Sequence, residues 1–178
     1  MKKILFVVVA VLTFAACGHK VNRADLLSDI EQKEASLDYS SCDIDAIDSV
    51  KNEMVVLYRQ FYTTFPTDSL APGYMQRVAD MLISLERTDE AVAVLDSIIK
   101  QYPEYQDMGG CWFLKGYAYE EAEQFPQARE AYTYFIDNYP DHYLAESTRS
   151  AIQYIGMTPE EMFDAIMNSA SDKGLSAL

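Results

Sequence analysis

Apolar residues along most of this chain recur every three or four positions, which is the period of an amphipathic helix. Two such stretches come first, one from Arg23 to Leu37 and a longer one from Asp45 to Phe65. No stretch alternates apolar and polar residues in the manner of a half-buried β-strand. The pattern therefore predicts an all-α protein of about seven helices.

The helical pattern is interrupted three times by an aromatic residue followed by proline. The prolines of these pairs, Pro66, Pro103 and Pro140, lie 37 residues apart. Proline ends a helix because it has no N–H to donate and disfavours helical geometry in the residue before it. An equal interval of this kind indicates helical units that repeat and stack on one another.

The unit that ends at Pro140 has the clearest pattern. Its second half places four residues on one helical face: Ala128, Tyr132, Phe135 and Tyr139. Its first half does the same with three residues: Trp112, Gly116 and Tyr119. A glycine inside a helix costs about 1 kcal/mol relative to alanine, so Gly116 indicates a neighbouring helix that passes too close for a side chain. We therefore predict two antiparallel helices that cross at Gly116.

This arrangement resembles the tetratricopeptide repeat, a helix–turn–helix unit with a signature of large, small and aromatic positions. The residues that carry the resemblance are Trp112, Gly116, Tyr119, Ala128, Tyr132 and Pro140. The preceding unit follows the signature more loosely, through Met75, Val78, Ala79, Leu82, Ala91, Leu95, Ile98 and Pro103. The resemblance implies a right-handed superhelix of α-α hairpins that binds other proteins and catalyses nothing.

The pattern also divides the chain into segments. We expect N-terminal capping helices in residues 23–65 and the two repeats in residues 66–140. A C-terminal helix pair is expected in residues 141–168, its first helix running from Tyr143 to Ile155 and stopping at Gly156. The segment Thr158-Pro159-Glu160-Glu161 is a capping box that opens the last helix, and residues 169–178 are expected to form a flexible tail.

The first residues have the pattern of a signal peptide. Lys2 and Lys3 precede residues 4–16, which are apolar except for Thr13 and shorter than the about 20 residues that span a bilayer. The ending Ala15-Ala16-Cys17 resembles the lipobox of bacterial lipoproteins. The resemblance implies that residues 1–16 are removed, that Cys17 carries a fatty acyl anchor of the palmitate type, and that residues 17–22 form a tether. The alternative is an ordinary signal peptide cut after Ala16, with Cys17 unmodified.

The residues after the cysteine bear on the compartment. By lipoprotein convention, Gly18 in place of an aspartate implies the outer membrane, and the lack of an acidic run implies a periplasm-facing position. The chain is thus similar to small repeat lipoproteins of the Gram-negative envelope, such as those of outer-membrane protein assembly and the Tol-Pal system. This similarity implies an interaction scaffold in envelope assembly or maintenance.

The charge balance restricts the possible partners. Residues 1–16 hold two of the 14 basic residues and none of the 28 acidic ones, so residues 17–178 carry a net charge of −16. Such a surface disfavours nucleic acid and anionic lipid as ligands. The same charge is also common in exported proteins, where it serves solubility.

The repeat register indicates a candidate binding groove. It places Phe113, Tyr117 and Glu120 on the helix face that lines the concave groove of tetratricopeptide repeats, and the matching residues of the earlier repeat are Gln76, Asp80 and Ile83. Together they would form an acidic groove with an aromatic floor, which favours a partner segment with Lys or Arg. Two alternatives stay open: the N-terminal helix of the chain fills the groove, or a pocket lined by Tyr117 and Tyr154 captures a small ligand or glycan.

Residues suited to catalysis or metal binding are few. His19 lies on the tether and His142 lies in a turn, where neither is positioned to activate a nucleophile. The cluster Asp43, Asp45 and Asp48 lacks the glycine and the final glutamate of a calcium loop, and capping of the long helix by Asp43 or Asp45 explains it better. We therefore predict no enzymatic activity, no cofactor and no metal.

Two cysteines besides Cys17 are present, Cys42 and Cys111. An oxidising compartment would allow them to form a disulfide. The sequence does not show whether they lie close together, so the choice between a disulfide and two free thiols stays open.

Overall fold

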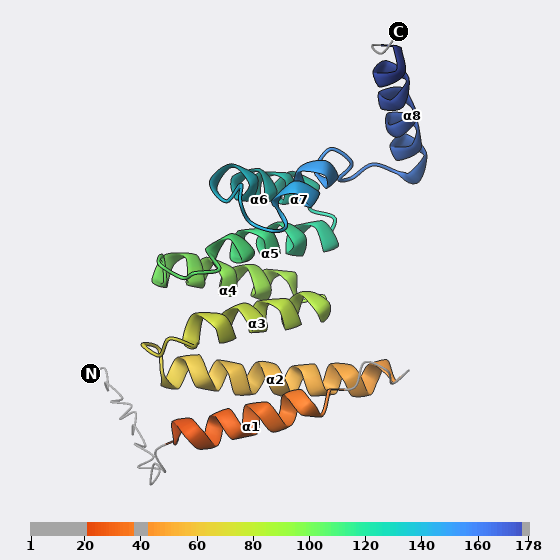
Figure 1. The fold of residues 1–178 in the computed structure, drawn as a ribbon. Helices are drawn as coiled ribbons and strands as arrows, with labels where there is room; N and C mark the ends of the chain where they lie inside the picture. The colour runs from red at the N-terminus through yellow and green to blue at the C-terminus, as the bar shows by residue number, and fades with distance from the viewer. Residues whose placement is uncertain (1–20, 38–42, 176–178) are drawn as a thin grey trace, which may run out of the picture.

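The computed structural model describes residues 21–37 and 43–175, and Figure 1 shows it as a stack of helices. Within these residues there are eight helices and no strand, which confirms the all-α class with one helix more than expected. The helices are α1 (Arg23–Ala35), α2 (Ile44–Thr64), α3 (Ala71–Ser84), α4 (Thr88–Gln101), α5 (Met108–Glu121), α6 (Phe125–Asn138), α7 (Ala145–Ala151) and α8 (Pro159–Leu175).

Helices α1 to α7 pack against one another in chain order, and α3 also contacts α5. This order forms consecutive antiparallel hairpins, as expected for a tetratricopeptide-type superhelix (Figure 1). The hairpins α3–α4 and α5–α6 are the two units that the 37-residue interval predicted.

The aromatic–proline pairs end α2, α4 and α6 in the same way. The helix caps Phe65, Tyr102 and Tyr139 each donate a backbone N–H to the carbonyl four residues earlier, at 2.8, 2.8 and 2.9 Å. The proline that follows each cap cannot donate, so the helix stops there. The three connectors after these prolines lie on one edge of the stack, the edge at which α1 also begins (Figure 1).

Side-chain caps define several helix starts. The carboxylate of Asp43 accepts the N–H of Ala46 at 3.0 Å, which confirms Asp43 as the cap of α2. Asn22 caps α1 in the same manner through the N–H of Ala24. The acidic cluster at the start of α2 is therefore explained by helix capping.

The hydrophobic core runs without interruption from Leu26 in α1 to Ala118 in α5. A smaller cluster around Ala128, Tyr132 and Ile155 extends it toward the C-terminal end. Because one core spans α1 to α5, the N-terminal helices and the repeats are expected to unfold together.

Helices α5 and α6 approach each other most closely at Gly116. A Cβ atom at this glycine would lie 2.5 Å from Cδ1 of Tyr132 and within 2.8 Å of two further ring carbons. The close crossing predicted from Gly116 is therefore confirmed, with Tyr132 as the residue that occupies the space.

The C-terminal part differs from the expectation in three respects. Helix α7 ends at Ala151, not at Ile155, because the guanidinium of Arg129 on α6 binds the carbonyls of Ile152 and Ile155, at 2.7 and 2.6 Å. Helix α8 extends to Leu175, so the backbone is helical over much of the expected tail. Helix α8 also packs against no other described helix, and it therefore does not pair with α7.

The capping box of α8 is confirmed. The N–H of Thr158 donates to the Glu161 carboxylate at 2.8 Å, and the N–H of Glu161 donates to the Thr158 hydroxyl at 3.2 Å. Gly156 precedes it with a φ of +78°, a conformation that glycine adopts without strain. These features separate α7 from α8 and set the direction in which α8 leaves the stack.

None of the helices in the described ranges is both long and apolar enough to cross a membrane. The predicted signal peptide, Cys17, most of the tether, His19 and Cys42 lie outside the described residues.

Candidate functional site

A pocket of 240 Å³ opens where α5, α6 and the α7 region meet. It is lined by Phe113, Tyr117, Glu120, Tyr132, Ser147, Thr148, Ala151, Ile152 and Ile155. Three of the six predicted groove residues therefore lie together here, all on α5. We refer to this site as the α5–α7 pocket.

The floor of the α5–α7 pocket is aromatic and firmly held. The hydroxyl of Tyr132 donates to the Glu120 carboxylate at 2.8 Å. The ring of Phe113 lies 5.6 Å from the ring of Tyr132 and 5.7 Å from that of Phe135. Tyr117 stacks parallel to Phe113 with 37% of its surface exposed, so it is the aromatic side chain of this site that a partner can reach.

Negative charge surrounds the exposed tyrosine. Partial burial raises the pKa of Tyr117, and the nearby carboxylates of Glu121, Asp80 and Glu120 raise it further. Burial and the hydrogen bond to Glu120 also raise the pKa of Tyr132. Both hydroxyls are therefore neutral at physiological pH, and no basic side chain is among the residues that line the pocket.

The other three predicted groove residues have different surroundings. Gln76 is engaged within the chain, because its amide donates to Asp107 at 2.8 Å and accepts the hydroxyl of Tyr105 at 2.6 Å. Ile83 is only 6% exposed and belongs to the core. Asp80 reaches solvent, although the atoms packed around its carboxylate raise its pKa. Of these three, Asp80 contributes to the acidic surroundings of Tyr117.

The contribution from α7 was missed in the sequence. Ser147, Thr148 and Ala151 form one wall of the pocket. The 37-residue interval, applied once more, places Thr148 at the position of Cys111 in the preceding repeat, and both residues are buried. Extending the 37-residue interval into α7 would therefore have predicted that α7 forms one wall of the pocket.

The structure bears on both alternatives to a partner segment in the predicted groove. Helix α1 packs against α2, at the other end of the stack, so it does not fill the α5–α7 pocket (Figure 1). Tyr154 lines a different pocket, of 540 Å³, together with residues such as Phe125 and Met162. The two pockets adjoin, because Glu120, Ala151 and Ile155 line both.

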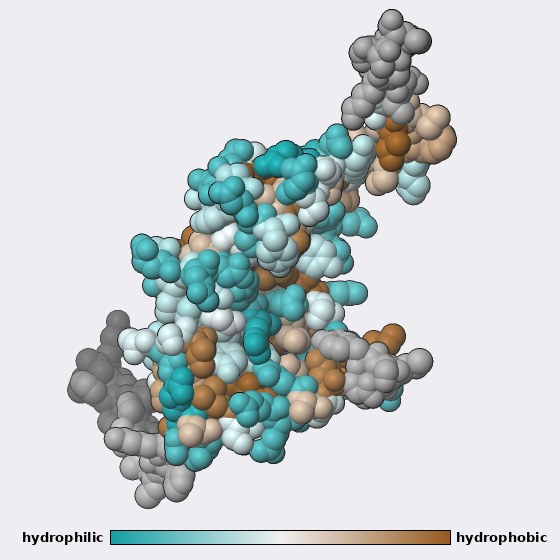
Figure 2. Space-filling view, in the orientation of Figure 1, coloured by the Kyte–Doolittle hydropathy of each residue, from teal (hydrophilic) through white to brown (hydrophobic). Residues whose placement is uncertain are grey.

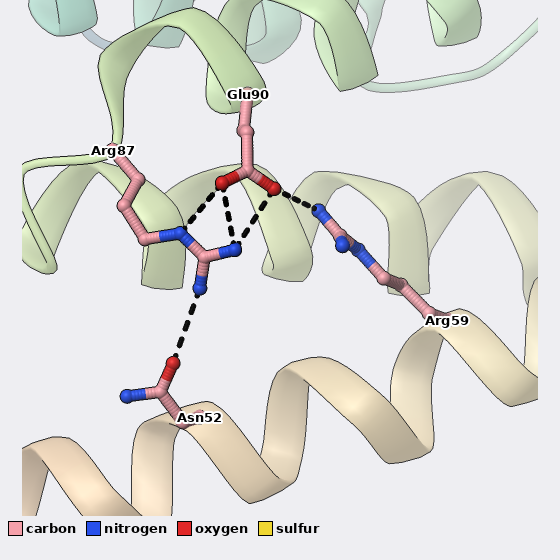
Figure 3. Close-up of polar contacts among 4 residues, drawn as sticks. All are labelled: Asn52, Arg59, Arg87 and Glu90. Atoms are coloured by element: carbon pink, nitrogen blue, oxygen red, sulfur yellow. Dashed lines mark hydrogen bonds and ion pairs between the residues drawn. The ribbon is translucent and has the colours of Figure 1, made fainter.

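A charged cluster joins α2 to the start of α4. The guanidinium of Arg87 donates to both carboxylate oxygens of Glu90 at 2.7 and 2.8 Å and to the side-chain oxygen of Asn52 at 3.1 Å. Arg59 on α2 donates to the same carboxylate at 3.0 Å (Figure 3). These hydrogen bonds hold the carboxylate of Glu90 in its ionised form and lower its pKa. The cluster ties the turn before α4 to α2.

A second polar contact joins the first three helices. Glu34 on α1 accepts the hydroxyl of Tyr58 on α2 at 2.8 Å and pairs with Arg77 on α3. Burial is the largest cause of the raised pKa of Tyr58. The contact therefore orients α1 across the α2–α3 hairpin.

No group of three or more potential metal ligands comes together in the described ranges. Asp48 pairs with Lys51 at 3.2 Å. His142 lies in the α6–α7 connector, where its Nε2 is 3.4 Å from Asp107 and its Nδ1 accepts the N–H of Leu144 at 3.3 Å. These groups have partners that account for them structurally.

Cys111 on α5 carries a free thiol, which lies in the hydrophobic core and has no exposed surface. Burial, and to a smaller extent Asp107, raises the pKa of the thiol from 9.0 to about 12. We expect the folded protein to alkylate at Cys111 far more slowly than the unfolded chain, because only the thiolate reacts. Mass spectrometry of iodoacetamide-treated protein measures this, and labelling at the unfolded-chain rate in native buffer would contradict the prediction.

The raised pKa of the Cys111 thiol also makes stability depend on pH. Between pH 9 and about 12 the unfolded chain loses the thiol proton first, so the free energy of unfolding falls as pH rises through that window.

Comparison with known families agrees with the fold. Residues 75–105 and 111–142 match the family model described as tetratricopeptide repeat. No curated protein and no solved structure matched the chain. Proteins built from such repeats are typically non-catalytic scaffolds that bind protein partners. The matches cover most of the hairpins α3–α4 and α5–α6, which thus have the sequence pattern and the fold of tetratricopeptide repeats, and protein–protein interaction is the function that such repeats indicate.

Proposed function

We propose that this chain is a lipid-anchored scaffold of the bacterial cell envelope that binds a basic segment of another protein in the α5–α7 pocket. Acylated Cys17 holds it at the outer membrane, and the repeats face the periplasm. The observation that carries the binding proposal is the exposed Tyr117 over an aromatic floor within a tetratricopeptide repeat. The proposed role is assembly or maintenance of the envelope.

The pocket sizes suit a protein segment. The α5–α7 pocket, at 240 Å³, accommodates one side chain, and the adjoining pocket of 540 Å³ continues the same surface past Glu120. An extended segment can therefore place one residue in each. A repeat scaffold binds such segments along its surface through contacts of this kind.

The charges favour lysine or arginine in that segment. Glu120 lines both pockets, Glu123 lines the larger one, and Asp80 and Glu121 lie close to Tyr117. A guanidinium over the ring of Tyr117 would gain a cation–π contact in addition to the carboxylates. Complementary charge also accelerates encounter and excludes acidic competitors.

The position of α1 determines which edge of the stack an anchor at Cys17 would bring to the membrane. Arg23 at its start pairs with Asp68 of the α2–α3 connector at 2.6 Å, which fixes the point where the chain enters the stack. Residues 18–22 span at most about 18 Å when fully extended. The connector edge would therefore lie next to the membrane.

The anchor is tested by labelling cells with an alkyne analogue of palmitate. We expect label on the natural chain and on Cys42→Ser, and none on Cys17→Ser. The N-terminal peptide of the natural chain should begin at Cys17 and carry the mass of the acyl chains. A peptide that begins at Cys17 without acyl mass would establish the ordinary signal peptide instead.

The binding site is tested with residues 17–178, carrying Cys17→Ser, and fluorescent peptides of varied charge. Basic peptides should bind, acidic ones should not, and Tyr117→Ala should weaken binding by about tenfold or more. Tyr143→Ala is the matched control, because Tyr143 is an exposed tyrosine of the α6–α7 connector outside the pocket. If glycans raise the melting temperature and no peptide binds, the chain is a ligand-capture protein and the proposal is wrong.

A further inference from the structure

Helix α8 has an apolar face that nothing in the described structure covers. It leaves the stack after Gly156 and contacts none of the other described helices (Figure 1). Phe163 is 63% exposed and Ile166 is 45% exposed. Figure 2 shows hydrophobic residues gathered at the start of this helix. In an ordinary repeat, a helix at this position would bury such residues against its neighbour.

The spacing makes the face continuous. Met162, Phe163 and Ile166 fall within one arc of the helix, since positions three and four apart share a face. Glu160 and Asp164 lie four residues apart and border that arc on one side. The helix is therefore amphipathic, with an acidic flank along an apolar stripe.

The acidic residues beside the apolar face determine which kind of partner can bind α8. The apolar surface nearest to α8 on this chain, and hence on a second copy, carries Glu120 and Glu123, which repel Glu160 and Asp164. A membrane-surface helix is rich in lysine and arginine on its polar face, whereas α8 has one lysine, Lys173, against four acidic residues. The remaining class is a protein groove with an apolar floor and a basic rim.

We propose that α8 is a recognition helix that inserts Phe163 and Ile166 into an apolar groove of a partner protein whose rim presents Lys or Arg to Glu160 and Asp164. This is the helix-in-groove mode of recognition, which uses anchors at helical spacing. Met162 adds a flexible, polarisable contact that adapts to the groove. Phe163 and Ile166 lie outside the α5–α7 pocket, although Met162 also lines the adjoining pocket of 540 Å³.

The fold prepares α8 for this role. The capping box satisfies backbone donors of its first turn without help from the rest of the stack, which favours the helical form of α8 in the free protein. Its start lies at the end of the stack opposite α1 (Figure 1), so it is directed away from the point where the chain enters the stack.

The test is photocrosslinking from position 163 of the full chain in its native cells. A benzophenone amino acid replaces Phe163, and a second chain carries it at Glu146, whose side chain is 84% exposed on α7. We expect one protein adduct from position 163 and none from position 146. The crosslinked peptide of the partner should lie in an apolar groove bordered by Lys or Arg.

Charge reversal tests whether the surface that contacts α8 is a groove with a basic rim. Glu160→Lys with Asp164→Lys should reduce the adduct about tenfold or more, whereas Tyr117→Ala should leave it unchanged. Glu161 is kept, because it caps the helix; circular dichroism checks that α8 stays helical. An adduct with a second copy, with the same chain or with lipid would overturn the proposal. So would the absence of an adduct, or an adduct that survives the charge reversal.

Discussion

Gly116→Leu is expected to abolish the folded state. The new side chain would enter space that the ring of Tyr132 already occupies, 2.5 Å from the position of the Cβ atom. Tyr132 cannot move aside cheaply, because it is 4% exposed and its hydroxyl is bonded to Glu120. The helices α5 and α6 would have to separate, and that separation removes contacts that a domain of about 5–15 kcal/mol net stability cannot lose. Thermal melting followed by circular dichroism should show no cooperative transition.

Gly116→Ala tests the same contact with a smaller side chain than leucine. In an exposed helix this change stabilises by about 1 kcal/mol, but here overpacking should destabilise by about 1–3 kcal/mol. Gly73→Ala on α3 is the matched control, because the atom nearest to its Cβ would be the hydroxyl of Tyr105, at an ordinary 3.7 Å. We expect the control to melt at the natural temperature or above it. Equal melting temperatures for both alanine variants would show that the α5–α6 crossing is wrong.

Phe61→Ala is expected to cost about 3–5 kcal/mol in the free energy of unfolding. Phe61 on α2 is completely buried. Its ring lies 4.7 Å from that of Tyr74 on α3 and 5.4 Å from that of Phe65, and the guanidinium of Arg23 on α1 lies 5.8 Å from its centre. The loss removes contacts that join three helices, and it leaves a cavity that the rigid stack cannot close.

Urea unfolding measures this cost and also its cooperativity. A single transition is expected, because one core spans α1 to α5. Phe61→Leu, which keeps most of the volume, should lose less than about 1.5 kcal/mol. A cost below about 1 kcal/mol for Phe61→Ala, or a separate early transition, would show that α1 and α2 are not integral to the repeat core.

The parts of the fold that sequence patterns predicted are those that depend on nearby residues. Caps such as Asp43 and the Thr158–Glu161 box are formed within a few residues of chain. The aromatic–proline ends are equally local. The crossing at Gly116 was predictable for a different reason, because a glycine in a helix interior is costly unless a neighbouring helix needs the space.

The parts that were not predicted depend on contacts distant in the sequence. Helix α7 stops early because Arg129, from the preceding helix, binds the carbonyls that follow its last turn. The repeat register identified Ile83 as a groove residue, but it is buried in the core that α3 shares with the neighbouring helices. The sequence also did not predict that Phe163 is exposed, because residue spacing shows an apolar face but not whether another helix covers it.

The central claim, that this repeat stack binds a protein partner through the α5–α7 pocket, is tested most directly by co-purification. The anchored chain is crosslinked in native envelopes, purified, and its companions are identified by mass spectrometry. In chains that also carry Glu160→Lys and Asp164→Lys, which removes the partner proposed for α8, we predict one reproducible protein partner that is lost with Tyr117→Ala and retained with Tyr143→Ala. Recovery of the same partner with both variants, or of lipid and bulk envelope protein alone, would contradict the claim.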